Sequence, residues 1–453
     1  MGDTVIISGD IVLPNQVMRD AALELQGGRI SNIHSIDAAK GLTPTHDYSG
    51  QLVFPGLIDA HVHAYSSSDK QEGIERLTKG AAVGGVTTII DMPYDRPTAI
   101  TNADLIRAKI KVVQREAVVD VALFGTIKKH GGWKEIVSLS QAGVCGFKLS
   151  TYETDPDRFP KISDSELIKT FRELQKVGRV ALFHAENGAI IDPLIEELRP
   201  LGEEHPEAHC WSRPLYSETT SVLKLLELAR NFPVKLHIVH LTAPQGYDAV
   251  NWYRGQGVDV TAETCTQYLT LTEQALSEHR GLAKCNPPVR DEATKEELWQ
   301  RIFNDEVAFI TSDHAPWPLS AKQAPNIFDN ASGMPGVELL FPLLFSEGVV
   351  KRNLHPSKLA DLLSKGPAER YGLHPRKGTL QVGTDADITV IDPSKRWTVE
   401  AAKSQSIAQW SPYDGWEISG KVVSTFVRGQ QVFDGTHVTQ QPGYGQFVSP
   451  CIQ

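Results

Sequence analysis

Two histidines separated by a single residue, His61 and His63, are the side chains whose type and spacing best suit chemistry in this sequence. They come at the end of the apolar run Leu52–Ala64, which has the composition of a buried strand. Residues two apart on a strand point to the same face, so both imidazoles can contact one metal ion. The same pair can also face solvent or satisfy a buried hydrogen bond, and a metal site therefore needs further ligands.

Three more residues of ligand type, His184, His240 and Asp313, each end another apolar, strand-like run. Imidazole and carboxylate groups suit divalent ions of the zinc type. Taken singly, each residue is better explained by a structural role, but together the four histidines and the aspartate favour a metal centre. His237 is a weaker candidate because strand parity points it away from His240.

A lysine, Lys148, ends the apolar run that starts at Gly143. A buried ammonium group is costly unless it is paired or loses its charge. One interpretation is a partly buried lysine that pairs with a nearby carboxylate. The other is an amine that burial deprotonates and that then takes up CO₂ to form a carbamate. A carbamate has two oxygens and a negative charge, so it can bridge two metal ions as a carboxylate would.

Short apolar runs alternate with longer amphipathic stretches through the middle of the chain, and these elements must position the candidate ligands. Eight runs rich in Val, Ile, Thr and Phe read as buried strands: Leu52–Ala64, Val86–Met92, Val121–Ile127, Val144–Ser150, Val180–Ala185, Leu236–Leu241, Val258–Thr264 and Val307–Ser312. Segments between them, such as Asp164–Val177, Glu218–Asn231 and Ala293–Phe303, have helical spacing with charged outer faces. This alternation predicts an α/β fold, a parallel (β/α)₈ barrel of the TIM type, whose mouth would gather the candidate ligands. An open doubly wound sheet is the alternative, but no Gly-rich phosphate motif follows any of these runs.

The two ends of the chain have a different pattern, with short strands separated by turns. The strand-like runs are Thr4–Ser8, Ala21–Gln26, Arg29–Ile36, Asp387–Ile391, Lys421–Arg428 and Gln431–Phe433. Because chain termini usually lie close together, we expect both ends to pair into one small β-sandwich domain. The predicted division is 1–51 and 378–453 for this domain and 52–377 for the barrel.

Composition excludes several classes of partner and site. The chain of 453 residues carries 45 Lys and Arg against 55 Asp and Glu, a net charge of −10, which argues against a nucleic-acid partner. No apolar run reaches the roughly 18–20 residues of a membrane helix, so no membrane association is expected. Five Cys without a C-x-x-C pair exclude a disulfide framework and a thiolate zinc site. With no signal peptide evident, a cytoplasmic location is predicted.

Several motifs occur in a characteristic order along nearly the whole chain. They are Pro55–His63 (PGLIDAHVH), Gly146–Lys148 (GFK), His184–Asn187 (HAEN), Lys284–Arg290 (KCNPPVR), Ser312–Pro316 (SDHAP), and Gly378–Leu380 with Gly383–Asp387 (GTL and GTDAD). In these motifs the sequence resembles the cyclic amidohydrolases, a family that includes allantoinases, hydantoinases or dihydropyrimidinases, and dihydroorotases.

The resemblance implies a centre of two divalent metal ions. His61, His63 and Asp313 would hold one ion, His184 and His240 the other, and carbamylated Lys148 would bridge them together with a hydroxide. Zinc is expected first, although cobalt, nickel, manganese and iron suit the same ligands. The hydroxide would attack a ring carbonyl, and the catalytic Asp313 would move the proton to the departing ring nitrogen. The reaction would open a small cyclic amide, and the family implies a homo-oligomer, either a dimer or a tetramer.

The motifs disagree on which ring is opened. Dihydroorotases usually have an Arg soon after this histidine pair, which binds the carboxylate of the substrate. No Arg follows His61 and His63 closely here, and this counts against dihydroorotate as the substrate. The KCNPP segment with Asn286 and Pro287 looks most like allantoinase, whereas Glu263–Leu269 looks more like a hydantoinase segment. We therefore rank allantoin first, a hydantoin or dihydropyrimidine second, and another cyclic imide or lactam third.

Two further positions depart from the hydantoinase pattern. The expected Tyr at 153 is Glu, with Tyr152 one residue early, and Asp95 stands where the family often has Asn. Loop drift explains these changes as well as altered specificity does. As candidate substrate contacts we name Asn286, Pro287, Tyr152 and Asp95, since allantoin carries a polar ureido tail. The alternative from a different functional class is a binding protein that holds no metal and has no catalytic activity. Such a homologue would have lost some of the metal-ligand residues, whereas all six ligand positions are filled in this sequence.

Overall fold

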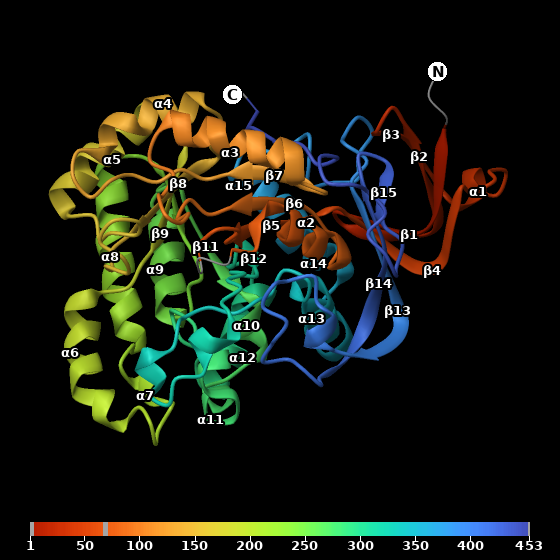
Figure 1. Cartoon of the computed structure of the whole chain (residues 1–453). Helices are drawn as coiled ribbons and strands as arrows, with labels where there is room; N and C mark the ends of the chain where they lie inside the picture. Colours follow the sequence, from red (N-terminus) through yellow and green to blue (C-terminus); the bar gives the residue numbers. More distant parts are fainter. Residues whose placement is uncertain (1–3, 67–70, 452–453) are drawn as a thin grey trace.

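The computed structural model describes residues 4–66 and 71–451, and the chain forms a barrel wrapped by helices beside a sheet built from both chain ends (Figure 1). The strands of the barrel are β5 (Leu57–Val62), β6 (Val86–Asp91), β7 (Asp120–Leu123), β8 (Gly146–Ser150), β9 (Val180–His184), β10 (Lys235–Ile238), β11 (Val260–Cys265) and β12 (Phe309–Thr311). Each lies in or overlaps one of the eight predicted strand runs. All of the pairings between neighbouring strands are parallel.

The strands form a three-stranded and a five-stranded sheet that meet at both seams. At one seam Gly125 pairs with Phe147 of β8, and at the other Val62 of β5 pairs with His314 after β12. Backbone hydrogen bonds close the seams, with Lys148 N donating to Gly125 O at 2.9 Å. The strands thus form a ring, and the predicted (β/α)₈ barrel is confirmed over an open sheet.

Amphipathic helices cover the outside of the barrel (Figure 1). The longer ones are α2 (Gly73–Val83), α3 (Ala103–Glu116), α5 (Asp164–Val177), α6 (Gly188–Leu198), α8 (Leu215–Asn231), α9 (Pro244–Gly255) and α12 (Glu292–Phe303). Shorter ones are α4 (Ile136–Gln141), α7 (Ala208–Trp211), α10 (Thr266–Thr270), α11 (Gln274–His279), α13 (Leu340–Leu344), α14 (Pro356–Ala360) and α15 (Gly366–Arg370). The short helix α1 (Ile36–Ala39) lies away from the barrel, beside the sheet of the chain ends (Figure 1). Helix α5 has the predicted bounds because Ser163 caps its first turn and Gly178 ends it in a left-handed conformation.

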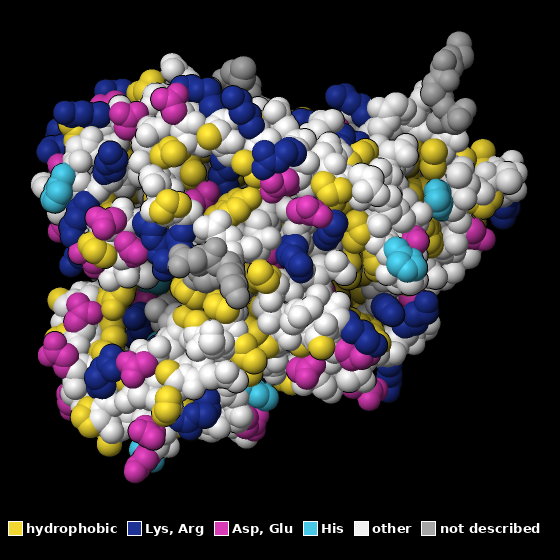
Figure 2. Space-filling model, viewed as in Figure 1, with side chains coloured by type: hydrophobic (Ala, Val, Ile, Leu, Met, Phe, Trp, Pro, Cys, Tyr) yellow, Lys and Arg dark blue, Asp and Glu magenta, His cyan; other side chains and the backbone are white. Residues whose placement is uncertain are grey.

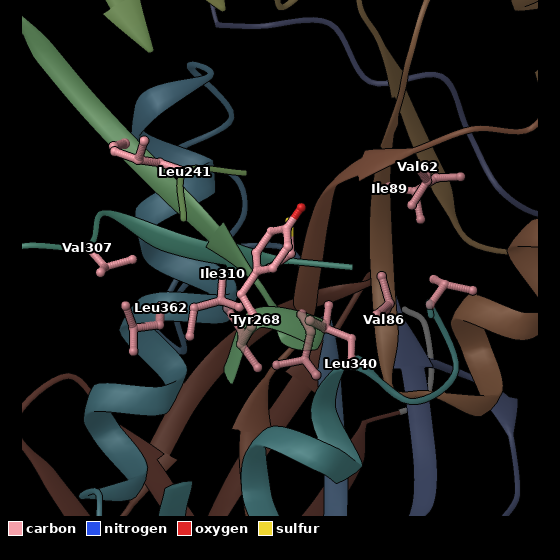
Figure 3. Packing of buried hydrophobic residues seen from close by; sticks show 14 of the residues in the cluster. Val62, Val86, Ile89, Leu241, Tyr268, Val307, Ile310, Leu340 and Leu362 are labelled. Atoms are coloured by element: carbon pink, nitrogen blue, oxygen red, sulfur yellow. The ribbon is translucent and has the colours of Figure 1, made fainter. Parts of the chain in front are cut away.

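Apolar side chains fill the space between the strands and the helices outside them. Figure 3 shows Val86 and Ile89 of β6 and Ile310 of β12 in this layer, together with Leu340 of α13. All four side chains are fully buried and belong to one hydrophobic cluster that spans the barrel. Burial on this scale fixes the strand ends, which carry the candidate ligands.

Strands from both chain ends pair within a single sheet, which confirms the predicted association of the two termini. Its order is β15-β14-β13-β4-β1-β2-β3, with β1 (Val5–Leu13), β2 (Gln16–Gln26), β3 (Arg29–His34), β4 (His46–Pro55), β13 (Ile388–Thr398), β14 (Glu417–Val427) and β15 (Gln430–Phe433). Ile7 and Leu23 from the N-terminal strands share a core with Ile388 and Phe426 from the C-terminal ones. The division into 1–51, 52–377 and 378–453 stays a proposal, since β4 runs through residue 52.

The surface carries both signs of charge. Figure 2 shows Lys and Arg interspersed with Asp and Glu over the face drawn there. Among the residues that the structure describes, none of the helices has the length and apolar character required to span a membrane.

Candidate active site

The predicted pair His61 and His63 meets Asp313 at the mouth of the barrel. The Nε2 atoms of the two histidines lie 3.2 and 3.4 Å from Asp313 Oδ1, and the ligand atoms of all three residues lie within 4.8 Å of one another. Ser66 Oγ contacts the other ring nitrogen of His63 at 3.1 Å. The three side chains can therefore face one cation together.

His184 and His240 form a second pair in the same mouth, with His184 Nδ1 3.0 Å from His240 Nε2. The ring centroids of His240 and His61 are 5.4 Å apart, so the two groups adjoin. His240 and Asp313 do not end their strands as predicted, because β10 stops at Ile238 and β12 at Thr311. Both residues instead have positive φ, 41° and 48°. Such strain, on the order of 1–3 kcal/mol each, is characteristic of functional sites.

Carboxylates behind the histidines determine which ring nitrogen faces the site. Glu263 Oε1 contacts His61 Nδ1 at 2.8 Å, and Glu186 Oε2 contacts His184 Nε2 at 2.6 Å. Metal-binding histidines usually donate their second N–H to a carboxylate in this way, which leaves the inward nitrogen free to bind an ion. Burial lowers the pKa of His61 and of His240 well below the ordinary value, so both imidazoles are neutral. The donor set therefore fits divalent metal ions.

Lys148 lies in the middle of β8 and not at a strand end, which corrects the prediction. Its side chain is buried, with Nζ 3.2 Å from His61 Nε2. Burial lowers the pKa of Lys148 to about 8, although Asp313 and Glu263 counteract part of this shift. Within residues 4–66 and 71–451, no carboxylate forms an ion pair with its ammonium group. The pairing interpretation of this lysine thus finds no partner, and an amine with this pKa is partly neutral at pH 7.

A cavity of about 270 Å³ opens onto these groups, a size near the lower end for small-molecule sites. Its lining comprises His61, His63, Ser66, Tyr94, Arg96, Lys148, Thr154, Asp155, Arg158, Phe159, His184, His240, Asn286, Asp313, Ala315, Trp317, Ser332 and Gly333. All six predicted metal ligands are among these residues. Of the four predicted substrate contacts, only Asn286 is.

The other three candidate substrate contacts have partners elsewhere. Asp95 Oδ1 lies 2.7 Å from the buried Lys109, and burial raises the pKa of Asp95 to about 6. Tyr152 packs under the guanidinium of Arg213, 4.9 Å from its ring centroid. The carbonyl of Pro287 accepts a hydrogen bond of 2.8 Å from the Tyr268 hydroxyl.

Sequence reasoning missed several side chains at this site. Glu263 and Glu186 support the histidines, and Arg213 contacts Glu186 at 2.6 Å. In the sequence Glu263 was visible as a charged residue inside an apolar run, and Glu186 as part of the HAEN motif. Tyr94 and Phe159 line the cavity as a stacked pair with centroids 3.7 Å apart. No local pattern pointed to these two, because they come from different loops.

Comparisons with known proteins identify the family of this chain. Residues 52–432 match the model of the amidohydrolase family. A protein named allantoinase from Bacillus licheniformis is 32% identical over 98% of this chain and 99% of its own length. Another allantoinase, from Salmonella choleraesuis, is 31% identical over 98% of each chain.

Solved structures show the same likeness over the full chain. L-hydantoinase (dihydropyrimidinase) from Arthrobacter aurescens superposes with a TM-score of 0.94 at 30% identity, covering 99% of this chain and all of the other. A D-hydantoinase superposes with a TM-score of 0.90 at 27% identity, over 99% of both chains. The predicted resemblance is confirmed, and the chain belongs to the amidohydrolase family as a cyclic amidohydrolase.

Proposed function

We propose that this enzyme hydrolyses the hydantoin ring of allantoin at an amide C–N bond to give allantoate. The observation that carries the proposal is the convergence of six ligand-type side chains on one cavity of small-molecule size. Relatives named allantoinase that match over nearly the full chain support this substrate.

We propose His61, His63 and Asp313 as ligands of one divalent ion and His184 and His240 as ligands of a second. Lys148, as a CO₂-derived carbamate, would bridge the two, and zinc is the ion we expect first. When bound, the ions would polarise the ring carbonyl and supply a hydroxide nucleophile near neutral pH.

Asp313 is the proposed general base and acid. Its carboxylate lines the cavity, and its side chain is 11% exposed, so Asp313 can reach both the nucleophile and a bound ring. It would take the proton from the attacking group and give it to the leaving ring nitrogen as the C–N bond breaks. The former ring nitrogen is then a neutral amide nitrogen, and the attacked carbonyl carbon becomes a carboxylate in the same ring-opened molecule.

Asn286 is the substrate contact that the cavity supports best. Its Oδ1 atom is buried and has no hydrogen-bond partner among the described residues. A buried acceptor without a partner costs about 1–3 kcal/mol, which a bound donor would remove. The ring of a cyclic ureide presents such N–H donors. We therefore propose that Asn286 Oδ1 accepts a hydrogen bond from a ring N–H.

A hydantoinase or dihydropyrimidinase is the second candidate. The observation that favours it is the TM-score of 0.94 with a hydantoinase over the whole chain. Other cyclic imides rank below it, and dihydroorotate lower still. The homo-oligomer and the cytoplasmic location remain predictions.

The substrate assignment is tested by incubating metal-loaded enzyme with allantoin, hydantoin, dihydrouracil and dihydroorotate and following ring opening. We expect the highest kcat/KM for allantoin. Fast opening of dihydrouracil without turnover of allantoin would reverse the ranking. A metal content below one equivalent per chain, with activity unaffected by chelation, would favour a different mechanism. A low metal content without opening of any ring would favour the non-catalytic class.

A further inference from the structure

Two arginines, Arg96 and Arg158, stand at the mouth of the active-site cavity. Both line this cavity and also a neighbouring hollow of about 370 Å³ that Gln71 and Pro97 complete. The candidate ligands Lys148 and His61 lie deeper and are each 1% exposed. The arginines thus lie on the outer side of the cavity, away from its floor.

The guanidinium of Arg158 is held by an ion pair and by hydrogen bonds within the protein. Its Nε and Nη2 atoms donate to Asp155 Oδ2 at 3.1 and 2.9 Å, and Nη1 donates to the Tyr94 carbonyl at 2.9 Å. Its positive charge is matched by Asp155, and each of its three nitrogens contacts an oxygen of the chain. Arg158 is thus held in the cavity wall with its charge paired.

The guanidinium of Arg96 is engaged very little. Nε donates a long hydrogen bond of 3.4 Å to the Ser66 carbonyl, and the Nη atoms have no hydrogen bond or ion pair within residues 4–66 and 71–451. The guanidinium group carries five N–H donors, and most of these have no partner among the described residues. Apart from Asp313, a proposed metal ligand, Asp155 is the one acidic residue among the described lining residues, and Arg158 pairs with it.

The backbone of Arg96 is held in place although its side chain is not. Its N–H donates to the Tyr65 carbonyl at 2.9 Å, and its own carbonyl accepts from Gln71 Nε2 at 3.0 Å. Ser66, the neighbour of Arg96, contacts His63 in the candidate metal site. The arginine is therefore anchored relative to the reacting centre, which is what a residue that selects substrates requires.

We propose that Arg96 binds an acceptor oxygen on the substituent of the ring and so selects cyclic amides that carry a polar substituent. The inference rests on the proposed function, since it assumes that the ring opens at the cavity floor. In allantoin the substituent is a ureido group on the carbon next to the attacked carbonyl, and its carbonyl oxygen is the acceptor. A carboxylate substituent offers the same chemistry with a full negative charge.

The test compares Arg96→Gln and Arg96→Lys with the wild-type enzyme. Substrates are allantoin, unsubstituted hydantoin, hydantoin-5-acetic acid and 5-benzylhydantoin, with kcat and KM measured for each. Arg76→Gln is the matched control, because Arg76 is an exposed residue of α2 outside both hollows. Metal content and thermal unfolding establish that each variant is folded and loaded.

For Arg96→Gln we expect the ratio of kcat/KM for allantoin to that for hydantoin to fall by about 10- to 100-fold, mainly through KM. Arg96→Lys should retain part of the ratio, and Arg76→Gln all of it. Stronger loss for hydantoin-5-acetic acid than for allantoin would identify a carboxylate as the preferred acceptor. A fall of equal size for hydantoin and allantoin, or an unchanged ratio, would overturn the inference. If the wild-type enzyme opens none of these rings, the proposed function itself has failed.

Discussion

Two buried clusters of metal-ligand residues in this protein differ in how the charge of a central lysine is balanced. One is the barrel mouth around Lys148, and the other contains Asp120, Asp385 and Asp387 around Lys377. Both lysines are 1–2% exposed. The two clusters show that ligand-type side chains lying close together are not enough to identify a metal site, because a lysine can already occupy the place of the ion.

The three carboxylates of the second cluster already hold a cation. Lys377 Nζ lies 2.7 Å from Asp120, 2.6 Å from Asp387 and 3.1 Å from Asp385, and Arg428 also pairs with Asp120. Burial alone would lower the pKa of Lys377, but these carboxylates raise it above its ordinary value. The network joins β7 of the barrel to the start of β13, so its role is to connect the barrel to the terminal sheet.

At the barrel mouth the effect of burial on the lysine exceeds that of the carboxylates. Lys148 is closest to the imidazole of His61, and burial lowers its pKa to about 8. Its amine is thus uncharged in part of the molecules at neutral pH and open to reaction. The difference teaches that the function of a buried lysine depends on the carboxylates packed around it.

The largest expected effect tests the reactive lysine. Lys148→Ala should lose metal and lower kcat by roughly 10³-fold or more, because the bridging group is removed. Ring opening and metal content per chain are the measurements. Millimolar acetate or propionate should restore part of the activity by replacing the carbamate. A fully active alanine variant would show that Lys148 does not bridge metals.

The second prediction tests the paired lysine against the reactive one. Lys377→Met should lower the free energy of unfolding by about 3–5 kcal/mol, since it leaves buried carboxylates without their cation. The folded fraction should keep its metal and its kcat. In metal-free protein Lys148→Met, the matched variant, should be neutral or stabilising, because that lysine has no carboxylate partner among the described residues. Denaturant unfolding of both variants checks this, and equal destabilisation would contradict the comparison.

The third prediction concerns the carboxylate behind His61. Glu263→Gln should weaken metal affinity by about 10- to 100-fold, because Glu263 holds His61 at one oxygen and His237 at 3.1 Å with the other. Metal titration of metal-free protein measures the change. Glu75→Gln, on the outer helix α2, should leave metal affinity unchanged. Equal affinities of the two variants would mean that Glu263 does not orient the ligand.

The smallest effect follows from the pKa of Lys148. The neutral amine that reacts with CO₂ rises from about 10% at pH 7 to about 90% at pH 9 when the pKa is about 8. With dissolved CO₂ held constant, reactivation of metal-free enzyme by metal should become about tenfold faster over this range. An ordinary lysine, with a pKa near 10.4, would give about a 100-fold rise from a far lower rate. Activity measured in samples taken at successive times gives the reactivation rate at each pH and distinguishes the two pKa values.

Much of the fold and of the candidate site could be predicted from local sequence. The barrel strands were visible because buried parallel strands are continuous apolar runs, and α5 was predicted to the residue by its cap and terminal glycine. The ligands followed because a barrel gathers strand ends at one mouth. The exact ends were not visible, since His240 and Asp313 lie beyond their strands in left-handed turns.

The substrate contacts could not be predicted in the same way. Asp95 was a reasonable polar candidate, but Lys109 on α3 captures it through an ion pair that no local pattern reveals. Arg96, its neighbour, lines the cavity instead. Which of two adjacent polar residues faces a ligand depends on the partners that other loops supply.

By itself the sequence determined the family, the barrel and the set of ligand-type residues, because these depend on strand periodicity and on motifs that are continuous along the chain. Tertiary structure alone decided what each buried charge does. Lys148 and Lys377 are both buried lysines, yet Lys377 pairs with Asp385 and Asp387, which are near it in the chain, and with Asp120, which is far from it. Electrostatic energy depends on distance in space, so the charge state of a lysine is a property of the folded protein.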